Sequence, residues 1–169
     1  MAIDVTAGQR LTAATLNAFV PMYFVVGTDQ SVTTTFANWN VGALTFGANQ
    51  IWDCFIMLDY SVSANGNTFQ TQWVAPTGGA TQSRIFDWGP SAAAATVSVS
   101  AATESAFQSR TQGANVGHNG TTSTTIRGVV FQRFTVTTVA SGSITPQVAV
   151  NTGTGTLYTG SYFVAHRLS

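Results

Sequence analysis

The sequence contains very little charge and no lysine. Its 169 residues include six Arg, five Asp and one Glu, so charged residues make up 7% of the chain and the formal net charge is zero. Typical globular domains carry about 25% charged residues. Nucleic-acid binding depends on neutralising phosphates, and anionic membrane surfaces attract basic segments. The composition therefore disfavours both as partners. Because charge normally keeps small proteins apart, so weakly charged a composition also favours self-association.

Cysteine, signal-like segments and long apolar runs are also scarce. Cys54 is the single cysteine, which excludes an intrachain disulfide and a cysteine-based zinc cluster. It lies within the apolar run 51–58, where a free thiol packs as a small hydrophobe. We expect no metal and no cofactor. The N-terminus has no basic, apolar signal sequence, and no apolar run is long enough to cross a bilayer.

Groups suited to catalysis are few. His118 and His166 are the two histidines, and the sequence has no Gly-x-Ser-x-Gly nucleophile motif. Asp53 and Asp59 share a strand face but lie about 20 Å apart along an extended strand. That separation exceeds the range of about 5–9.5 Å found for glycosidase carboxylate pairs. The sequence therefore predicts a protein that is not an enzyme.

The residues that are abundant favour β-structure. Hydrophobic residues make up 44% and aromatic residues 11% of the chain, and Thr occurs 27 times. Thr, Val, Phe and Tyr pack well on pleated surfaces. Gly and Asn separate short apolar segments, and Asn65-Gly66 predicts a hairpin turn. The Thr/Ser/Gly-rich stretch 111–125, with His118 in a turn, is a candidate exposed tip. The predicted strands cover 22–27, 30–36, 40–46, 50–62, 68–75, 83–88, 95–103, 124–138, 143–150 and 156–167.

Two predicted strands are apolar on both faces. In 51–60 one face carries Trp52, Cys54, Ile56, Leu58 and Tyr60, which is a core pattern. The other face carries Phe55 and Met57 between Asp53 and Asp59, and the face with Val129 and Phe131 repeats this pattern. An exposed sandwich face is normally polar. Either a second layer or the N-terminal segment covers these faces, or they form a subunit interface, which we favour. The predicted oligomer interface comprises Phe55, Met57, Val129 and Phe131.

Residues 1–21 differ from the remainder, 22–169. Thr12 is a suitable N-cap for a short helix over 13–18, and Pro21 ends the segment. So short a helix is not stable alone and must dock on something. We predict an N-terminal attachment arm followed by a single β-sandwich domain. The arm's apolar contacts are predicted to be Leu11, Leu16, Phe19 and Val20.

The arm also carries a resemblance. Residues 7–18, AGQRLTAATLNA, resemble the opening of many virion proteins from tailed phages of actinobacteria, of the minor-tail, tail-fibre or head-decoration type. The segments 141–150 and 160–164 are similar to the last two strands of their β domains. The resemblance covers about a quarter of the chain. It implies an antiparallel jelly-roll or TNF-like β-sandwich, assembled as a homotrimer. Because the sequence shows no signal segment, we expect synthesis in the bacterial host cytoplasm.

We therefore expect a non-enzymatic protein on the virion surface, whose partners are itself and other tail or capsid proteins. A tail or fibre component that contacts host glycans is the first hypothesis, and a capsid decoration protein is the second. A standalone carbohydrate-binding module is a further alternative, since aromatic faces bind sugars. Trp88 and His118 are the candidate ligand contacts.

Overall fold

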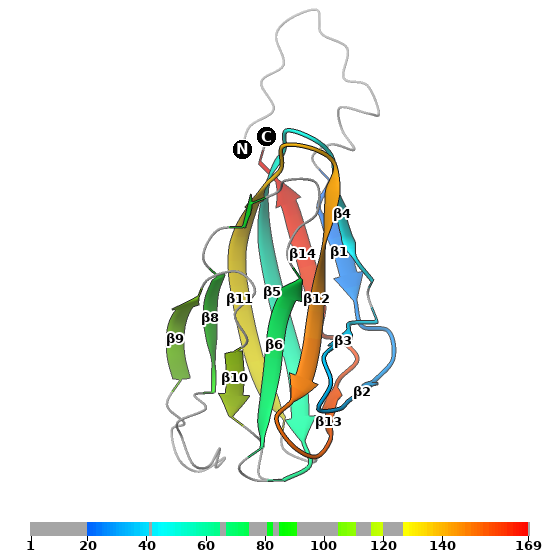
Figure 1. The fold of residues 1–169 in the computed structure, drawn as a ribbon, viewed down its shortest axis with the longest axis vertical. Helices are drawn as coiled ribbons and strands as arrows, with labels where there is room; N and C mark the ends of the chain where they lie inside the picture. The colour runs from blue at the N-terminus through cyan, green and yellow to red at the C-terminus, as the bar shows by residue number, and fades with distance from the viewer. Residues whose placement is uncertain are drawn as a thin grey trace, which may run out of the picture.

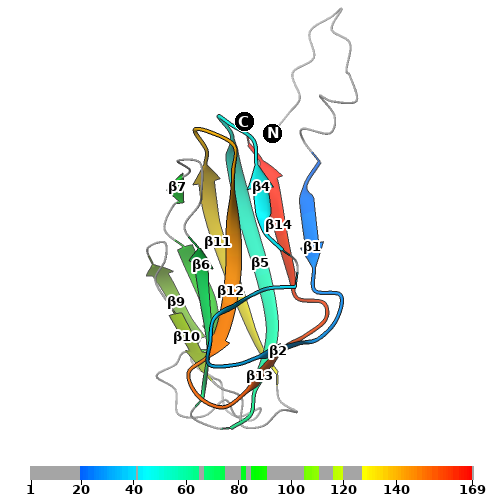
Figure 2. The same cartoon turned by 45° about the vertical axis from the view of Figure 1, so that its right-hand side comes forward.

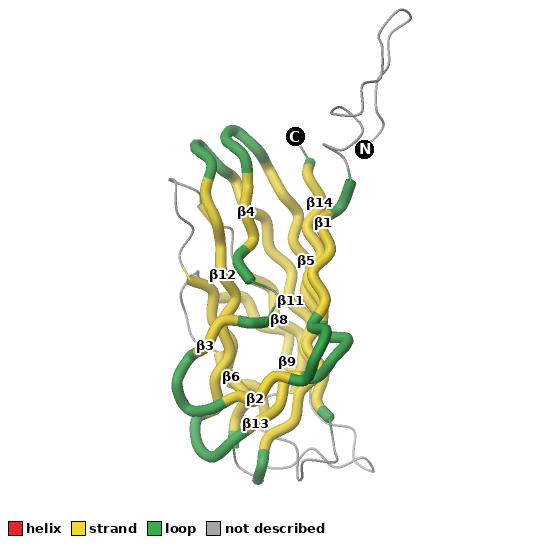
Figure 3. The backbone as a smooth tube through the Cα atoms, turned by 90° about the vertical axis from the view of Figure 1, so that its right-hand side faces the viewer, coloured by secondary structure: helices red, strands yellow, loops and turns green. Residues whose placement is uncertain are grey.

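The computed structural model describes residues 20–40, 42–64, 67–74, 81–82, 85–90, 105–110, 116–119 and 127–168. These residues form strands and connecting loops, with no helix among them (Figure 3). The helix predicted over 13–18 and the strand predicted over 95–103 lie outside the described residues.

The larger sheet, sheet A, has nine strands. Its main path runs in the order β1-β14-β5-β11-β8-β9, with β2, β7 and β13 attached to it, and every pairing is antiparallel (Figure 1). The strands are β1 (Met22–Val25), β2 (Gln30–Val32), β5 (Ile51–Val62), β7 (Thr81–Gln82), β8 (Ile85–Pro90), β9 (Ser105–Arg110), β11 (Gly128–Thr137), β13 (Gly155–Leu157) and β14 (Tyr162–Arg167).

The smaller sheet, sheet B, has five strands. Its path is β10-β6-β12-β3, and β4 pairs with β12. All of these pairings are antiparallel as well. The strands are β3 (Ala37–Asn38), β4 (Leu44–Phe46), β6 (Thr68–Val74), β10 (Val116–Asn119) and β12 (Gly142–Val150). Sheet B stacks on one side of sheet A (Figure 2).

The strand order is that of a jelly roll. The first strand, β1, lies beside the last, β14, which pairs with β5, and β5 pairs with β11. In sheet B, β3 lies beside β12, which pairs with β6, and β6 pairs with β10. These eight strands form two four-stranded antiparallel layers, as in jelly-roll domains. The hairpin of β8 and β9 is inserted between β6 and β10 and extends sheet A. The predicted all-β antiparallel sandwich is confirmed.

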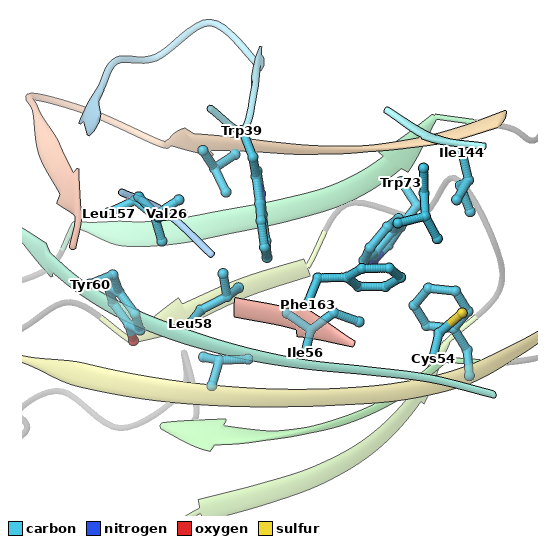
Figure 4. Close-up of a cluster of buried hydrophobic side chains, with 14 of the residues drawn as sticks. Val26, Trp39, Cys54, Ile56, Leu58, Tyr60, Trp73, Ile144, Leu157 and Phe163 are labelled. Carbon is cyan, nitrogen blue, oxygen red and sulfur yellow. The ribbon is translucent and has the colours of Figure 1, made fainter. Parts of the chain in front are cut away.

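The core lies between the two sheets. The inner face of β5 is the one predicted from alternation, and Trp52, Cys54, Ile56, Leu58 and Tyr60 are all buried. They pack against side chains of sheet B and of β14 (Figure 4). Burial raises the pKa of the Cys54 thiol well above its usual range, with a smaller contribution from the neighbouring charge of Asp53. Cys54 is therefore an unreactive core residue, as predicted.

Two predicted connections are wrong. The segment containing Asn65-Gly66 does not close a hairpin, because β5 belongs to sheet A and β6 to sheet B. Asn65 and Gly66 themselves lie outside the described residues. The strand predicted over 156–167 is divided into β13 and β14 by a turn at Gly160, whose φ is +93°. The turn redirects the chain from beside β2 to beside β1.

The polar stretch 111–125 also differs from its prediction. Val116–Asn119 forms strand β10, antiparallel to β6, so His118 lies in a strand and not in a turn. Backbone pairing with β6 supports this strand despite a sequence with little apolar alternation.

Candidate interaction face on the outer side of sheet A

The outer face of sheet A is the candidate functional surface. On β5 and β11 it is formed by the residues that alternate with the core. Among the described residues, sheet B covers only the opposite, inner face of these strands (Figure 2). The outer residues of β5 are half-buried by their neighbours on the sheet, and Val129 of β11 is 39% exposed.

The four residues predicted as an oligomer interface lie together on this face. Phe131 is directly opposite Met57 across the β5–β11 ladder, and Val129 is opposite Asp59. Phe55 stacks with Phe131 at 5.9 Å between ring centroids. It also contacts Tyr162 of β14 at 6.1 Å. We call Phe55, Met57, Val129 and Phe131 the apolar patch.

Two Arg–Asp ion pairs border the apolar patch along the strands. Arg133 Nε and Nη2 donate to the two carboxylate oxygens of Asp53 at 3.1 and 2.9 Å. Arg127 Nη1 donates to Asp59 Oδ2 at 2.8 Å, and its guanidinium lies 3.8 Å from the ring centroid of Tyr158. The hydrogen bonds that the arginines donate to these carboxylates raise the pKa of both arginines. Within each pair the Arg and Asp charges cancel, so the electrostatic field at the apolar patch is small.

A shallow groove of about 590 Å³ lies beside the patch, toward β1 at the edge of the sheet. Tyr23 and Val25 of β1 are 66% and 56% exposed along it. Register places Tyr23 opposite Val164, and Val25 opposite Tyr162. We call it the β1 groove; it is lined by Tyr23, Val25, Asp53, Phe55, Arg133, Gly160, Tyr162, Val164 and His166.

Sequence reasoning did not identify the β1 groove. Its signal was present in the alternation of outer residues in 22–25 and 162–167. However, those segments stand at opposite ends of the chain, and only the fold makes them neighbours.

The remaining predicted site residues are dispersed. Register places Trp88 of β8 opposite Phe131 in sheet A, whereas His118 of β10 is opposite Phe69 in sheet B. Trp88 and His118 therefore belong to strands of different sheets. Of the predicted arm contacts, Val20 is 56% exposed. Leu11, Leu16 and Phe19 lie outside the described residues.

Neither metal binding nor membrane spanning finds support in the described residues. Within them, His, Cys, Asp and Glu form no group of three or more that could hold a metal ion. The same part of the chain contains no helix with the length and hydropathy needed to traverse a bilayer. His166 is the register neighbour of Asp53, and this carboxylate is already paired with Arg133.

Comparison with known proteins gives distant structural matches. No protein-family model and no curated protein sequence matches the chain. A structure of infectious bursal disease virus strain Gx overlaps 88% of this chain at 11% identity, with a TM-score of 0.23. The VP2 subviral particle of that virus overlaps 99% of the chain at 12% identity, with a TM-score of 0.25. The chain spans 39% and 44% of the length of these two structures. The jelly-roll assignment rests on the strand order described above.

Proposed function

We propose that this protein is a non-enzymatic structural component on the surface of a bacteriophage particle. It assembles with copies of itself through the apolar patch on the outer face of sheet A, and its N-terminal arm attaches it to the particle. A tail or fibre location is the first proposal, and three copies per assembly is the number that the sequence resemblance implies. The resemblance of residues 7–18 to phage virion proteins supports the particle assignment.

The apolar patch is the observation that carries the assembly proposal. Its aromatic rings lie on a face that the second sheet does not cover, in a chain whose charged residues amount to 7%. Subunit interfaces have cores depleted in charge and enriched in aromatic residues and Met. The flanking Arg–Asp pairs correspond to the polar rim of such an interface. This combination favours a buried contact between copies.

Light scattering of the purified full-length protein tests the assembly. We expect the wild type to be a homo-oligomer at micromolar concentration. Phe131→Asp places an unpaired carboxylate among the rings of the patch, and burying such a charge costs about 3–5 kcal/mol. The variant should therefore dissociate into folded monomers under the same conditions.

Val139→Asp is the matched control. It adds the same charge at a position that is 67% exposed in the turn after β11, so its assembly should equal that of the wild type. A wild-type protein that is monomeric at micromolar concentration would contradict the assembly proposal. Equal dissociation of both variants would show that any added negative charge disrupts assembly, and it would contradict the apolar patch as the interface.

Capsid decoration is the second candidate location. The weakly charged composition, which favours self-association, suits a tail or a capsid location equally. The attachment arm also suits both locations. Imaging of intact particles that carry a labelled copy of this protein separates the two. Label along the tail supports the first proposal, and label distributed over the capsid supports the second.

A further inference from the structure

We propose that the β1 groove binds a short, electrically neutral carbohydrate. This inference adds a ligand to the particle-surface role proposed above, and it does not depend on self-assembly. The groove is lined by residues of β1, β14, β5 and β11, and its volume of about 590 Å³ falls within the range of about 300–1,000 Å³ typical of small-ligand sites.

One part of the groove is aromatic and apolar. Tyr23 is 66% exposed, and Tyr162 lies on the adjacent strand in contact with Phe55. Val164, the register neighbour of Tyr23, lines the groove with the small part of its side chain that is exposed, 6%. Sugar rings present C–H groups on their faces, and tyrosine combines an apolar ring with a polar end. The apolar part therefore suits the face of a sugar ring.

The other part of the groove is polar. His166, Asp53 and Arg133 follow one another across β14, β5 and β11. Arg133 uses Nε and Nη2 to bind Asp53, which leaves N–H donors on its other terminal nitrogen. The hydroxyls of Tyr23 and Tyr162 have no hydrogen-bond partner within the described part of the chain. Sugar hydroxyls both donate and accept, so they match this mixed set of groups.

The charge of the groove favours a neutral ligand. The bidentate Arg133–Asp53 pair cancels its own charge, so an anion or a cation gains little attraction. A purely aliphatic ligand would cover the tyrosine hydroxyls and the arginine N–H groups without pairing them, and that costs free energy. A neutral polyhydroxylated ligand avoids both penalties.

The β1 groove is separable from the apolar patch. The patch lies on β5 and β11, whereas most of the groove lies on β1 and β14. The two share Phe55, while Phe131 does not line the groove. Phe131 stacks on the groove residue Phe55, so the patch position that tests the groove independently is Val129, which does not line the groove.

The test uses the full-length protein and a panel of short neutral oligosaccharides built from glucose, mannose, galactose, arabinose or N-acetylglucosamine. Binding is measured by titration with ligand-observed NMR. We expect saturable binding of at least one member at millimolar concentration or below. Tyr23→Ala should weaken that binding by about tenfold, because an aromatic contact face is lost. Tyr162→Phe should weaken it by a smaller factor, because it removes one hydroxyl.

Val139→Ala, at an exposed position outside the groove, is the matched control and should bind as the wild type does. Val129→Asp, at a patch position that does not line the groove, should retain the affinity within about threefold, which separates this inference from the assembly proposal. Three outcomes would overturn the carbohydrate site: no binding by any neutral member of the panel, preferential binding of uronic-acid oligosaccharides, or binding unchanged by Tyr23→Ala in a correctly folded variant.

Discussion

At the scale of single residues, a buried glutamine connects the two sheets. Gln132 lies on the inner face of β11 and is 1% exposed. Its Oε1 accepts a hydrogen bond from Trp73 Nε1 of β6 at 3.1 Å, and its Nε2 donates to Thr71 Oγ1 at 2.9 Å. Burying a polar group costs free energy unless it is hydrogen-bonded. Because Gln132 belongs to sheet A and Trp73 to sheet B, their hydrogen bond fixes the relative position of the two layers. Alternation along β11 gives position 132 the parity of the core face but does not explain a polar residue there.

We predict that Gln132→Leu lowers the free energy of unfolding by about 1–3 kcal/mol, because the buried Trp73 N–H loses its acceptor. Gln72→Leu is the matched control. It removes the hydrogen bond between the Gln72 and Gln147 side chains, which is partly exposed, so water replaces the lost partner. Urea denaturation of both variants measures the difference. Equal stability of Gln132→Leu and the wild type would contradict a bridging role.

At the scale of strands, the sequence predicts faces better than connections. The alternation in 51–60 and in the part of the predicted strand 124–138 that forms β11 correctly separates core from outer residues, because a strand directs successive side chains to opposite faces. Asn65-Gly66 signals a change of direction, but local turn chemistry does not state whether the flanking strands pair. The β1 groove depends on a pairing between residues about 140 positions apart in the sequence, which no local pattern encodes.

A loop contact between elements gives a pH-dependent prediction. Asp29, in the loop between β1 and β2, accepts hydrogen bonds at 2.8 Å from both the backbone N–H and the hydroxyl of Thr159, in the turn before β14. These bonds lower the pKa of Asp29 from its ordinary value of 3.8, the backbone bond contributing most. A carboxyl whose pKa is lower in the folded state stabilises the fold above the unfolded pKa. That contribution is lost as the pH falls below 3.8 and through the folded value.

Asp29→Asn keeps an acceptor oxygen but cannot ionise. We expect the melting temperature of the wild type to exceed that of the variant at neutral pH, and the difference to shrink as the solution is acidified below pH 3.8. Thermal melts of both proteins across the acid range measure this difference. The titration of the other carboxylates cancels in it, because both proteins contain them. A difference that stays constant with pH would show that the contact does not depend on charge.

At the scale of the whole molecule, the chain enters and leaves the sandwich at the same end. Met22 of β1 is the register partner of Ala165 of β14, so the start of the first strand lies beside the end of the last one (Figure 1). The turns after β5 and β12 lie at the opposite end. An arm that leaves from the first end would hold the domain with those turns directed away from the particle. This arrangement leaves the side of the sandwich, with the apolar patch and the β1 groove, available to neighbours and ligands.

The final prediction concerns deletion of residues 1–20. The described β-structure begins at Met22, and among the described residues the core cluster and the side chains packed against it come from Met22 onward. The truncated protein should therefore fold, keep the melting temperature of the wild type within a few degrees, and self-assemble, but it should no longer join the particle. Burial of two or three arm side chains contributes only a few kcal/mol for each arm, at about 25 cal/mol per Å². Several arms on one assembly bind together, because linkage raises their effective concentration into the millimolar range.

Circular dichroism, light scattering and analysis of purified particles for the truncated protein measure these three properties. A second variant, Leu11→Ala with Leu16→Ala, keeps the length of the chain and removes only the predicted apolar contacts of the arm. It should fold and fail to incorporate in the same way. Normal incorporation of the truncated protein would contradict the attachment role. A sharp fall in melting temperature would instead identify the arm as a cover over its own domain, since a segment docked on the core contributes its buried area to the stability of the fold.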